Sequence, residues 1–391
     1  MVALQDLITP RMQRGMERMV TALNGQPDEV PVMAQLAAHT LRLTGVEDQS
    51  FWSDPDVFLR SHLMASEYYR LDMPSTYFDV YNVEAEAMGQ SLVWLPGEFP
   101  EIDRTRHLLR DPNDLDRLRP PDPSKDGRMP FVIEVYRRLY DIGVKAAFRY
   151  CGVFSLAANL RGLDALVMDI IQRPEWARRF FEFLTIDVLA PYLSYAREAI
   201  SRDMPVLGAD ALASLPIINP DIVEEFALGY TVKLRELIGN VALFGWWGDS
   251  YAKDPETIFN LKLIASPVYF YCLDPDAYLI GAEKIKAFAD QHDRPLILGM
   301  DCTLLAEGPI AAIVERARDY VRIGNEGGRL TIFLNAIPSE TPPDHVVAAV
   351  EAIKFYSKNQ SRPGNIDQPL TPSKAEPFTD WVARKAWQET D

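Results

Sequence analysis

The stretch GGRLTIFLNAIPSETPPDHVVAAVEAIK (327–354) contains one complete repeat of the fold. Its apolar run RLTIFL (329–334) is typical of a strand buried on both faces. The polar residue Asn335 follows the run, and Thr341-Pro342 then predicts the start of a helix. A strand followed by a helix is the βα unit from which parallel α/β folds are built.

Similar apolar, β-rich runs occur along the rest of the chain, and most are separated by segments with helical periodicity. They are VPVMAQL (31–37), STYFDV (75–80), AAFRYCGV (146–153), MPVLGA (204–209), VALFGWW (241–247), PVYFYCL (267–273) and PLILGM (295–300). Eight such units favour a (β/α)8 TIM barrel over a doubly wound sheet.

We predict one barrel domain over 1–357, with a proline-rich surface insertion at 97–127, after the second strand. The remaining 358–391 is predicted to be a C-terminal tail. Its Trp381 and Trp387 lie on a short amphipathic stretch, which favours docking on the barrel or on the partner subunit of a homodimer.

One predicted helix has clear ends. Asn219 and Pro220 are the expected N-cap and first-turn residues, and Gly239 is the expected end. Its predicted buried stripe consists of Ile222, Phe226, Tyr230 and Leu237.

Composition limits the class of protein. The chain has 391 residues, of which 48% are hydrophobic, enough for a large core. We expect a soluble protein, because no stretch approaches the roughly 20 apolar residues that span a bilayer. A net charge of −16 argues against nucleic acid and anionic membranes as partners. Three widely spaced cysteines and an N-terminus without an apolar signal core predict a reduced, cytoplasmic protein.

The segment YFDVYNVEAEAMG (77–89) is the strongest candidate for a site edge. Asp79 follows an apolar run, and Glu84 and Glu86 come next at a spacing that we interpret as strand-like. The neighbours Phe78 and Val80 are apolar, so Asp79 is expected to be poorly solvated. The segment also contains Tyr77, Tyr81 and Asn82.

Active sites of TIM barrels lie at the carboxyl ends of the strands. The residues just past the eight runs are His39, Asp79, Ser155, Asp210, Trp247 with Asp249, Cys272 with Asp274, Asp301 with Cys302, and Asn335. They are expected to surround one mouth. The alternative for each is a loop cap, since Asp and Asn side chains bond nearby backbone amides where a strand turns into a helix.

The chain resembles the uroporphyrinogen decarboxylase superfamily, which includes methyltransferases acting on corrinoid proteins and coenzyme M. The resemblance covers roughly residues 28–357. It rests on FDVYNVEAEAMG (78–89), RYCGVFSLAANLRG (149–162), LILGMDCTLL (296–305) and the stretch 327–354. It implies a TIM barrel enzyme in which Asp79 stands where the decarboxylases keep an essential aspartate.

Two departures from the family pattern bear on the reaction. The decarboxylases carry an arginine-rich N-terminal loop for the tetrapyrrole carboxylates, whereas 31–52 has Arg42 as its only arginine and His39 where that loop begins. The methyltransferase branch is the more similar one. Its usual zinc ligands are also absent here, since Trp246-Trp247 and Asn335 stand in their places.

A different zinc site is one interpretation of the cysteines. Its candidate ligands are Asp274, Cys302, Cys272 and Asp249. The alternative is that the cysteines are buried small hydrophobes, as Cys151 is expected to be.

Three functions follow from the resemblance. The first is transfer of a methyl group between a small methylated substrate, such as a methoxyarene, and a corrinoid held by a partner protein, with Asp79, Asp210 and His39 as catalytic candidates. The second is decarboxylation of a smaller acid, with Arg149, Arg161 or Arg42 holding its carboxylate. The third is a non-catalytic tetrapyrrole-binding barrel. The predicted substrate-binding residues are Tyr77, Tyr81, Asn82, Glu84, Phe154, Trp246, Trp247 and Asn335.

Overall fold

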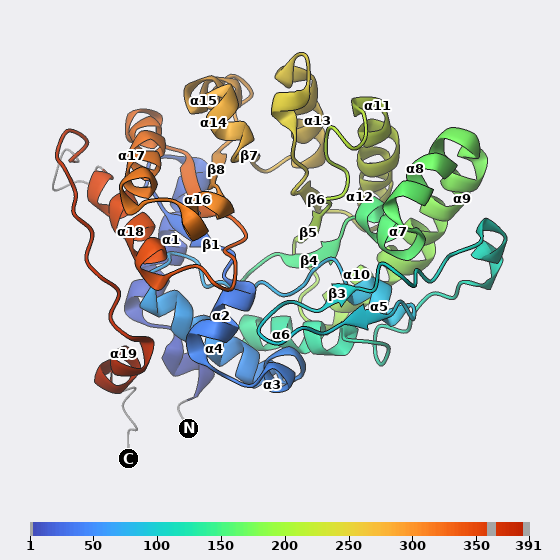
Figure 1. The fold of residues 1–391 in the computed structure, drawn as a ribbon, viewed down its shortest axis with the longest axis horizontal. Coiled ribbons are helices and arrows are strands. Elements are labelled where there is room, and N and C mark those ends of the chain that lie inside the picture. Colours follow the sequence, from blue (N-terminus) through green and yellow to red (C-terminus); the bar gives the residue numbers. More distant parts are fainter. Residues whose placement is uncertain (1–2, 358–364, 386–391) are drawn as a thin grey trace. The chain divides into compact units, whose positions relative to one another are not determined.

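The computed structural model describes residues 3–357 and 365–385. The chain divides into two compact units, the first formed by residues up to 77 and from 268 onward, the second by residues 78–267 (Figure 1). In the described residues no helix is both long enough and apolar enough to cross a membrane.

The first unit contains a parallel sheet in the order β1-β9-β8-β7 (Figure 1). Its strands are β1 (Val32–Ala34), β9 (Leu330–Leu334), β8 (Leu296–Met300) and β7 (Phe270–Leu273). Val32 pairs with Ile332, Leu296 with Leu330 and Phe270 with Leu296. Every residue of β7, β8 and β9 is buried, which is why these strands are continuous apolar runs.

Along the chain, the strands of this sheet alternate with the helices of the first unit. They are η1 (Leu4–Leu7), α1 (Pro10–Asn24), α2 (Ala37–Thr44), α3 (Asp48–Ser53), α4 (Pro55–Tyr68), α14 (Asp276–Ile280), α15 (Ala282–Gln291), α16 (Cys302–Glu307), α17 (Ile310–Gly327), α18 (Pro343–Tyr356) and α19 (Phe378–Lys385).

The second unit contains a parallel sheet in the order β4-β5-β6 and an antiparallel hairpin (Figure 1). The sheet strands are β4 (Phe148–Cys151), β5 (Val206–Ala209) and β6 (Val241–Phe244), and the hairpin strands are β2 (Leu92–Val93) and β3 (Glu101–Ile102). Of the two hairpin strands, β3 lies within the predicted insertion at 97–127, and β2 precedes it.

The helices of the second unit include two π-helical turns, η3 and η4. The full set is α5 (Val83–Ala87), η2 (Pro112–Arg117), α6 (Met129–Asp141), α7 (Val153–Arg161), α8 (Leu163–Gln172), α9 (Pro174–Phe183), η3 (Leu184–Leu189), α10 (Ala190–Ala199), α11 (Pro220–Ile222), η4 (Val223–Leu228), α12 (Gly229–Ile238), η5 (Asp249–Tyr251) and α13 (Pro255–Ala265).

Seven of the eight predicted strands are confirmed among the described residues, and the run 75–80 is the exception. Its backbone bonds go to side chains and near neighbours instead of a ladder. The amide of Ser75 donates to Ser66 Oγ at 2.8 Å, and the amide of Val80 donates to the Phe78 carbonyl at 2.8 Å. The prediction of Glu84 and Glu86 at strand spacing was also wrong, because both lie on α5.

The helix predicted from Asn219 to Gly239 forms as α11, η4 and α12, and Asn219 Oδ1 accepts the Ile222 amide at 2.9 Å. Its predicted stripe fails at Leu237, which is 51% exposed, while Leu234 is buried. The π turn η4 explains the difference, because an i→i+5 turn shifts the phase of the residues that follow it.

The described part of the tail packs on the first unit. Trp381 lies edge-on to Tyr68, with ring centroids 5.4 Å apart, and stacks on Phe378 at 5.7 Å. The Tyr68 hydroxyl donates to the Glu376 carbonyl at 2.5 Å. Trp387 lies outside the described residues.

Candidate functional site

Asp79 is held by an arginine that the sequence did not point to. Arg128, the residue before α6, donates from Nη1 to Asp79 Oδ1 at 2.7 Å and from Nη2 to Oδ2 at 2.5 Å. Only 1% of the Asp79 side chain and 10% of the Arg128 side chain are exposed. This bidentate geometry fixes the plane of the carboxylate. Asp79 is thus shielded from water, as expected from its apolar neighbours, and the guanidinium takes the place of water as its partner.

Further contacts immobilise Arg128. Its Nε donates to Glu86 Oε2 at 2.7 Å, and its guanidinium carbon lies 5.2 Å from the Trp94 ring centroid. Burial opposes the charged form, but Asp79 and Glu86 outweigh it, so the pKa of Arg128 is raised. Arg128 therefore stays a fixed cation between two carboxylates.

Asn82 connects this pair to the hairpin. Its Nδ2 donates to Asp79 Oδ2 at 3.3 Å and to the Pro100 carbonyl at 2.5 Å. Pro100 directly precedes β3, so one amide group contacts both the carboxylate and the insertion. Asp79, Asn82 and Glu86, all from the segment 77–89, are thus brought together with Arg128.

Glu84, on α5, is buried in the second unit and bonds to β4. It is 1% exposed, and its Oε1 accepts the Cys151 amide at 3.0 Å. Burial raises the pKa of Glu84 to about 8, against the opposing effect of that hydrogen bond. Glu84 therefore carries a proton at neutral pH.

A protonated, buried glutamate should make stability depend on pH. A carboxyl whose pKa is raised by folding favours the folded state below its unfolded pKa of about 4.5, and this advantage is lost as the pH rises through about 8. We expect the wild-type free energy of unfolding to fall across this window by up to about 1.4 kcal/mol per pH unit relative to Glu84→Gln. Urea unfolding at several pH values measures it. The exposed Glu236→Gln is the matched control, and parallel curves for wild type and Glu84→Gln would contradict the assignment.

Asp210, a predicted catalytic residue, lies against the first turn of α7. Its Oδ1 accepts the Ser155 amide at 2.7 Å and its Oδ2 the Phe154 amide at 3.3 Å. A Cβ at Gly152 would lie 2.5 Å from the Asp210 side chain, so only glycine permits this approach. Burial raises the pKa of Asp210 to about 6 despite these hydrogen bonds. The geometry is that of a helix cap, the alternative that the sequence left open.

The aromatic candidates of the second unit differ in accessibility. Trp246 is fully buried, whereas Trp247 is half-buried and its amide donates to Ser214 Oγ at 2.8 Å. Phe154 is fully buried, 5.9 Å from Phe181. The half-buried Tyr81 carries its hydroxyl toward Gly245, beyond the end of β6. Tyr81 and Trp247 therefore have surface left for a ligand.

In the first unit, His39 lies on α2, just after β1. Its Nε2 is 2.7 Å from the Tyr69 hydroxyl and its Nδ1 is 3.3 Å from the Ser339 carbonyl. Burial lowers the pKa of His39 to about 4, so the ring is neutral at pH 7. Tyr77 stacks on Phe333, with ring centroids 5.9 Å apart. Asn335 is buried, and its backbone N–H donates to the Met300 carbonyl at 3.3 Å.

Asp274, at the end of β7, is surrounded by donors. It accepts from Arg316, from the Tyr320 hydroxyl, from the Tyr278 amide at 3.1 Å and from the Asp301 amide at 3.2 Å. Burial raises its pKa, although Arg316 opposes the shift. Arg316 and Tyr320 are one turn apart on α17, a spacing that a search for helical i, i+4 pairs could have found.

The four predicted zinc ligands do not fit a metal centre. The Asp274 oxygens are already bonded, Cys272 is fully buried, and Asp249 forms a buried ion pair with Lys262. Among the described residues, no group of three or more His, Cys, Asp or Glu side chains could hold a metal ion.

Parallel βα units with polar groups at their carboxyl ends define the class of α/β barrel enzymes. Within that class, the model of the uroporphyrinogen decarboxylase (URO-D) family matches residues 14–356, and the chain belongs to that family.

The chain is similar to two known proteins. The chain is 26% identical over 335 residues to a uroporphyrinogen decarboxylase of Methylibium petroleiphilum, covering 79% of this chain and 83% of that protein. It is also similar to the structure of a methyltransferase from Methanosarcina mazei, with a TM-score of 0.71, 20% identity, and coverage of 87% of this chain and 98% of that one. The predicted (β/α)8 fold class is thereby confirmed.

Proposed function

We propose that this protein is a methyltransferase that moves a methyl group between a small methylated substrate, such as a methoxyarene, and a corrinoid carried by a separate protein. The similarity in fold to the Methanosarcina mazei methyltransferase, over nearly its whole length, supports the methyltransferase branch. So does the segment 31–52. Its single arginine, Arg42, pairs with Glu340 and leaves 57% of its side chain exposed, unlike a group that grips a buried polycarboxylate.

The chain's own residues would bind and orient the substrate. Asp79, fixed by Arg128, would accept a hydrogen bond from a hydroxyl or amine of the substrate, and a fixed acceptor needs no reorganisation during the reaction. Tyr81 and Trp247 would pack on an aromatic ring. The bound corrinoid would supply the nucleophile, and the departing oxygen or nitrogen would take up a proton.

The direct test is methyl transfer from a panel of methoxyarenes and methylated amines to free cob(I)alamin, followed by its absorbance. We expect turnover with at least one class and none with the demethylated products. Failure across the panel, with the protein folded, would contradict the proposal.

A decarboxylase acting on a smaller acid is the second candidate, and the Methylibium petroleiphilum relative favours it. Of the candidate arginines, Arg161 pairs with the carboxylate of Asp169 at 2.7 Å, whereas the half-buried Arg149 on β4 donates to the uncharged Tyr136 hydroxyl at 3.3 Å. Arg149 would therefore be the group that binds a substrate carboxylate. Release of carbon dioxide that disappears in Asp79→Ala would support this reaction. Stoichiometric uptake of a tetrapyrrole without turnover would instead support a binding protein.

A further inference from the structure

The loop between β9 and α18, residues 335–342, contains a strained backbone position. Ala336 has φ +42°, in the left-handed region that favours glycine. Ala37 has φ +39° and lies two residues after Gln35, whose carbonyl accepts the Ile337 amide at 3.0 Å. Because β1 and β9 are neighbours in the sheet, both alanines lie just past the carboxyl ends of adjacent strands. Residues keep such conformations only where surrounding contacts impose them, and they cluster at functional sites.

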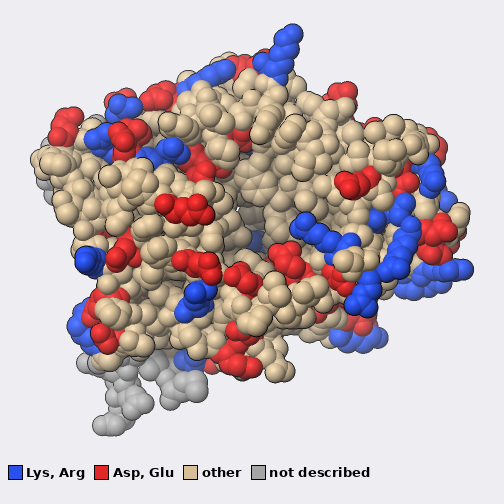
Figure 2. All heavy atoms as spheres, viewed as in Figure 1, with Lys and Arg blue, Asp and Glu red and all other residues tan. Residues whose placement is uncertain are grey.

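Exposed charges contribute little to holding this loop. Its Glu340 forms an ion pair with Arg42 at 3.2 Å, and 75% and 57% of the two side chains are exposed. Charged side chains of both signs are spread over the face that Figure 2 shows. Exposed ion pairs are weak because water and salt screen them. The restraint on Ala336 must therefore come from buried contacts.

His39 provides one of these buried contacts. Its Nδ1 is 3.3 Å from the carbonyl of Ser339, in the loop. A carbonyl can only accept, so Nδ1 carries the proton of the neutral ring, and Nε2 is left as an acceptor. The partner of Nε2 is the Tyr69 hydroxyl at 2.7 Å, which must therefore donate. Both nitrogens of His39 are thus used to connect Tyr69 to the loop.

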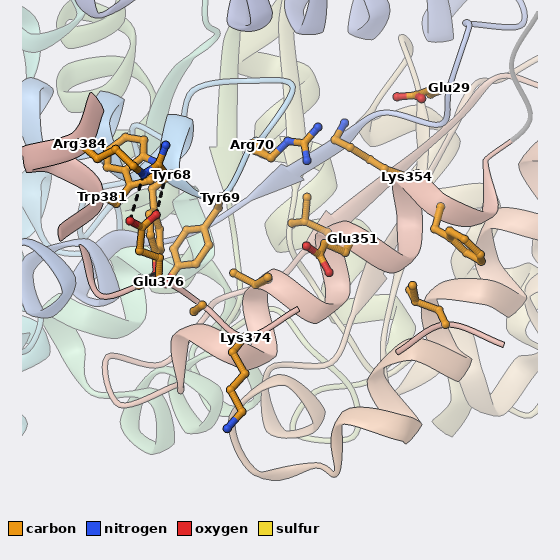
Figure 3. A pocket seen from close by; sticks show the side chains of 15 residues that line it. Glu29, Tyr68, Tyr69, Arg70, Glu351, Lys354, Lys374, Glu376, Trp381 and Arg384 are labelled. Carbon is orange, nitrogen blue, oxygen red and sulfur yellow. Dashed lines mark hydrogen bonds and ion pairs between the residues drawn. The ribbon is translucent and has the colours of Figure 1, made fainter. Parts of the chain in front are cut away.

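Tyr69 is held in turn by the C-terminal tail. Its ring lies edge-on to Tyr68, with ring centroids 4.8 Å apart, and Tyr68 lies edge-on to Trp381 at 5.4 Å. Figure 3 shows these three rings side by side. The Tyr68 hydroxyl also donates to the Glu376 carbonyl at 2.5 Å. Edge-to-face contacts between buried rings favour one mutual orientation. A continuous series of contacts therefore joins the tail to His39.

The tail also contacts the far end of the loop. The Ala375 amide donates to the Asp344 carboxylate at 2.6 Å, and Asp344 lies in the first turn of α18. The tail thus reaches the loop directly at the start of α18 and, through the two tyrosines and His39, at Ser339.

We propose that the C-terminal tail, residues 365–385, is a positioning element for the loop between β9 and α18 and acts through Tyr68, Tyr69 and His39. Because the loop begins at Asn335, the tail would fix the backbone from which Asn335 meets a ligand. This inference rests on the function proposed above only in taking Asn335 as a substrate-binding residue. Tyr69 and His39 are positioning residues, and neither needs to touch the substrate.

Hydrogen exchange followed by mass spectrometry tests this connection without a substrate. Trp381→Ala should speed exchange in 335–341 by about tenfold or more, because the loop would open locally more often, while exchange in 296–300 of β8 stays unchanged. Trp381→Phe keeps an aromatic ring beside Tyr68 and should restore most of the protection. Thr379→Ala, at an exposed position of α19, is the matched control.

Tyr69→Phe removes one hydroxyl and separates positioning from folding. We expect faster exchange in 335–341, wild-type exchange in 373–385 of the tail, and a wild-type circular dichroism spectrum. In nitrogen NMR of the imidazole, the Nε2 signal of His39 should shift, because it no longer accepts a hydrogen bond.

The proposal is overturned if Trp381→Ala or Tyr69→Phe leaves exchange in 335–341 at the wild-type rate, or if the wild-type His39 carries its proton on Nε2. Absence of methyl transfer by the wild type would contradict the proposed function alone, since neither measurement needs turnover.

Discussion

Asp79→Asn is expected to lower kcat/KM for methyl transfer by about two orders of magnitude, the usual effect of removing one positioned polar group from an active site. The Asp79 carboxylate accepts hydrogen bonds from both Nη groups of Arg128. An asparagine would offer one oxygen and would turn its own donor toward the second Nη, so both the charge and the orientation at this position would change.

Two further variants give this prediction its controls. Arg128→Lys keeps the positive charge but cannot form the bidentate pair, so we expect a smaller loss of activity. Asp203→Asn changes an exposed aspartate of the same unit and should have wild-type kinetics. If Asp79→Asn keeps wild-type turnover and substrate affinity, Asp79 is not part of the site.

Local sequence patterns were sufficient for most of the fold. Seven apolar runs became strands because burial on both faces of a parallel strand requires an uninterrupted apolar run. The run 75–80 is also rich in β-forming residues, but the Ser66 hydroxyl accepts the Ser75 amide and the Phe78 carbonyl accepts the Val80 amide. The burial of Leu237 was wrongly predicted for a similar reason. No residue type in the sequence indicates the π turn η4, which changes the face on which the following residues lie.

The candidate site was only partly predictable, because its contacts join distant residues. Asp79 was found from its position after an apolar run, but its partner Arg128 lies 49 residues further on, just past a surface insertion. Asp210 shows the opposite problem. A carboxylate after a strand suits both catalysis and capping, and only its bonds to the first turn of α7 distinguish the two.

Asp249 provides the largest expected effect on stability. It follows β6 and was a candidate metal ligand, yet its carboxylate binds the Lys262 ammonium of α13. Both side chains are at most 1% exposed. An ammonium that already neutralises the carboxylate takes the place a metal cation would occupy. The pair therefore acts as an internal ion pair that ties the end of β6 to the following helix.

We expect Lys262→Met to lower the free energy of unfolding by about 3–5 kcal/mol, because it leaves a buried carboxylate without its cation. Lys262→Met/Asp249→Leu should recover much of this loss, since removing both charges also removes their desolvation cost. Urea unfolding of the two variants measures the difference, with the exposed Lys253→Met as the control. A double variant less stable than Lys262→Met would show that Asp249 stabilises the fold through contacts other than this ion pair.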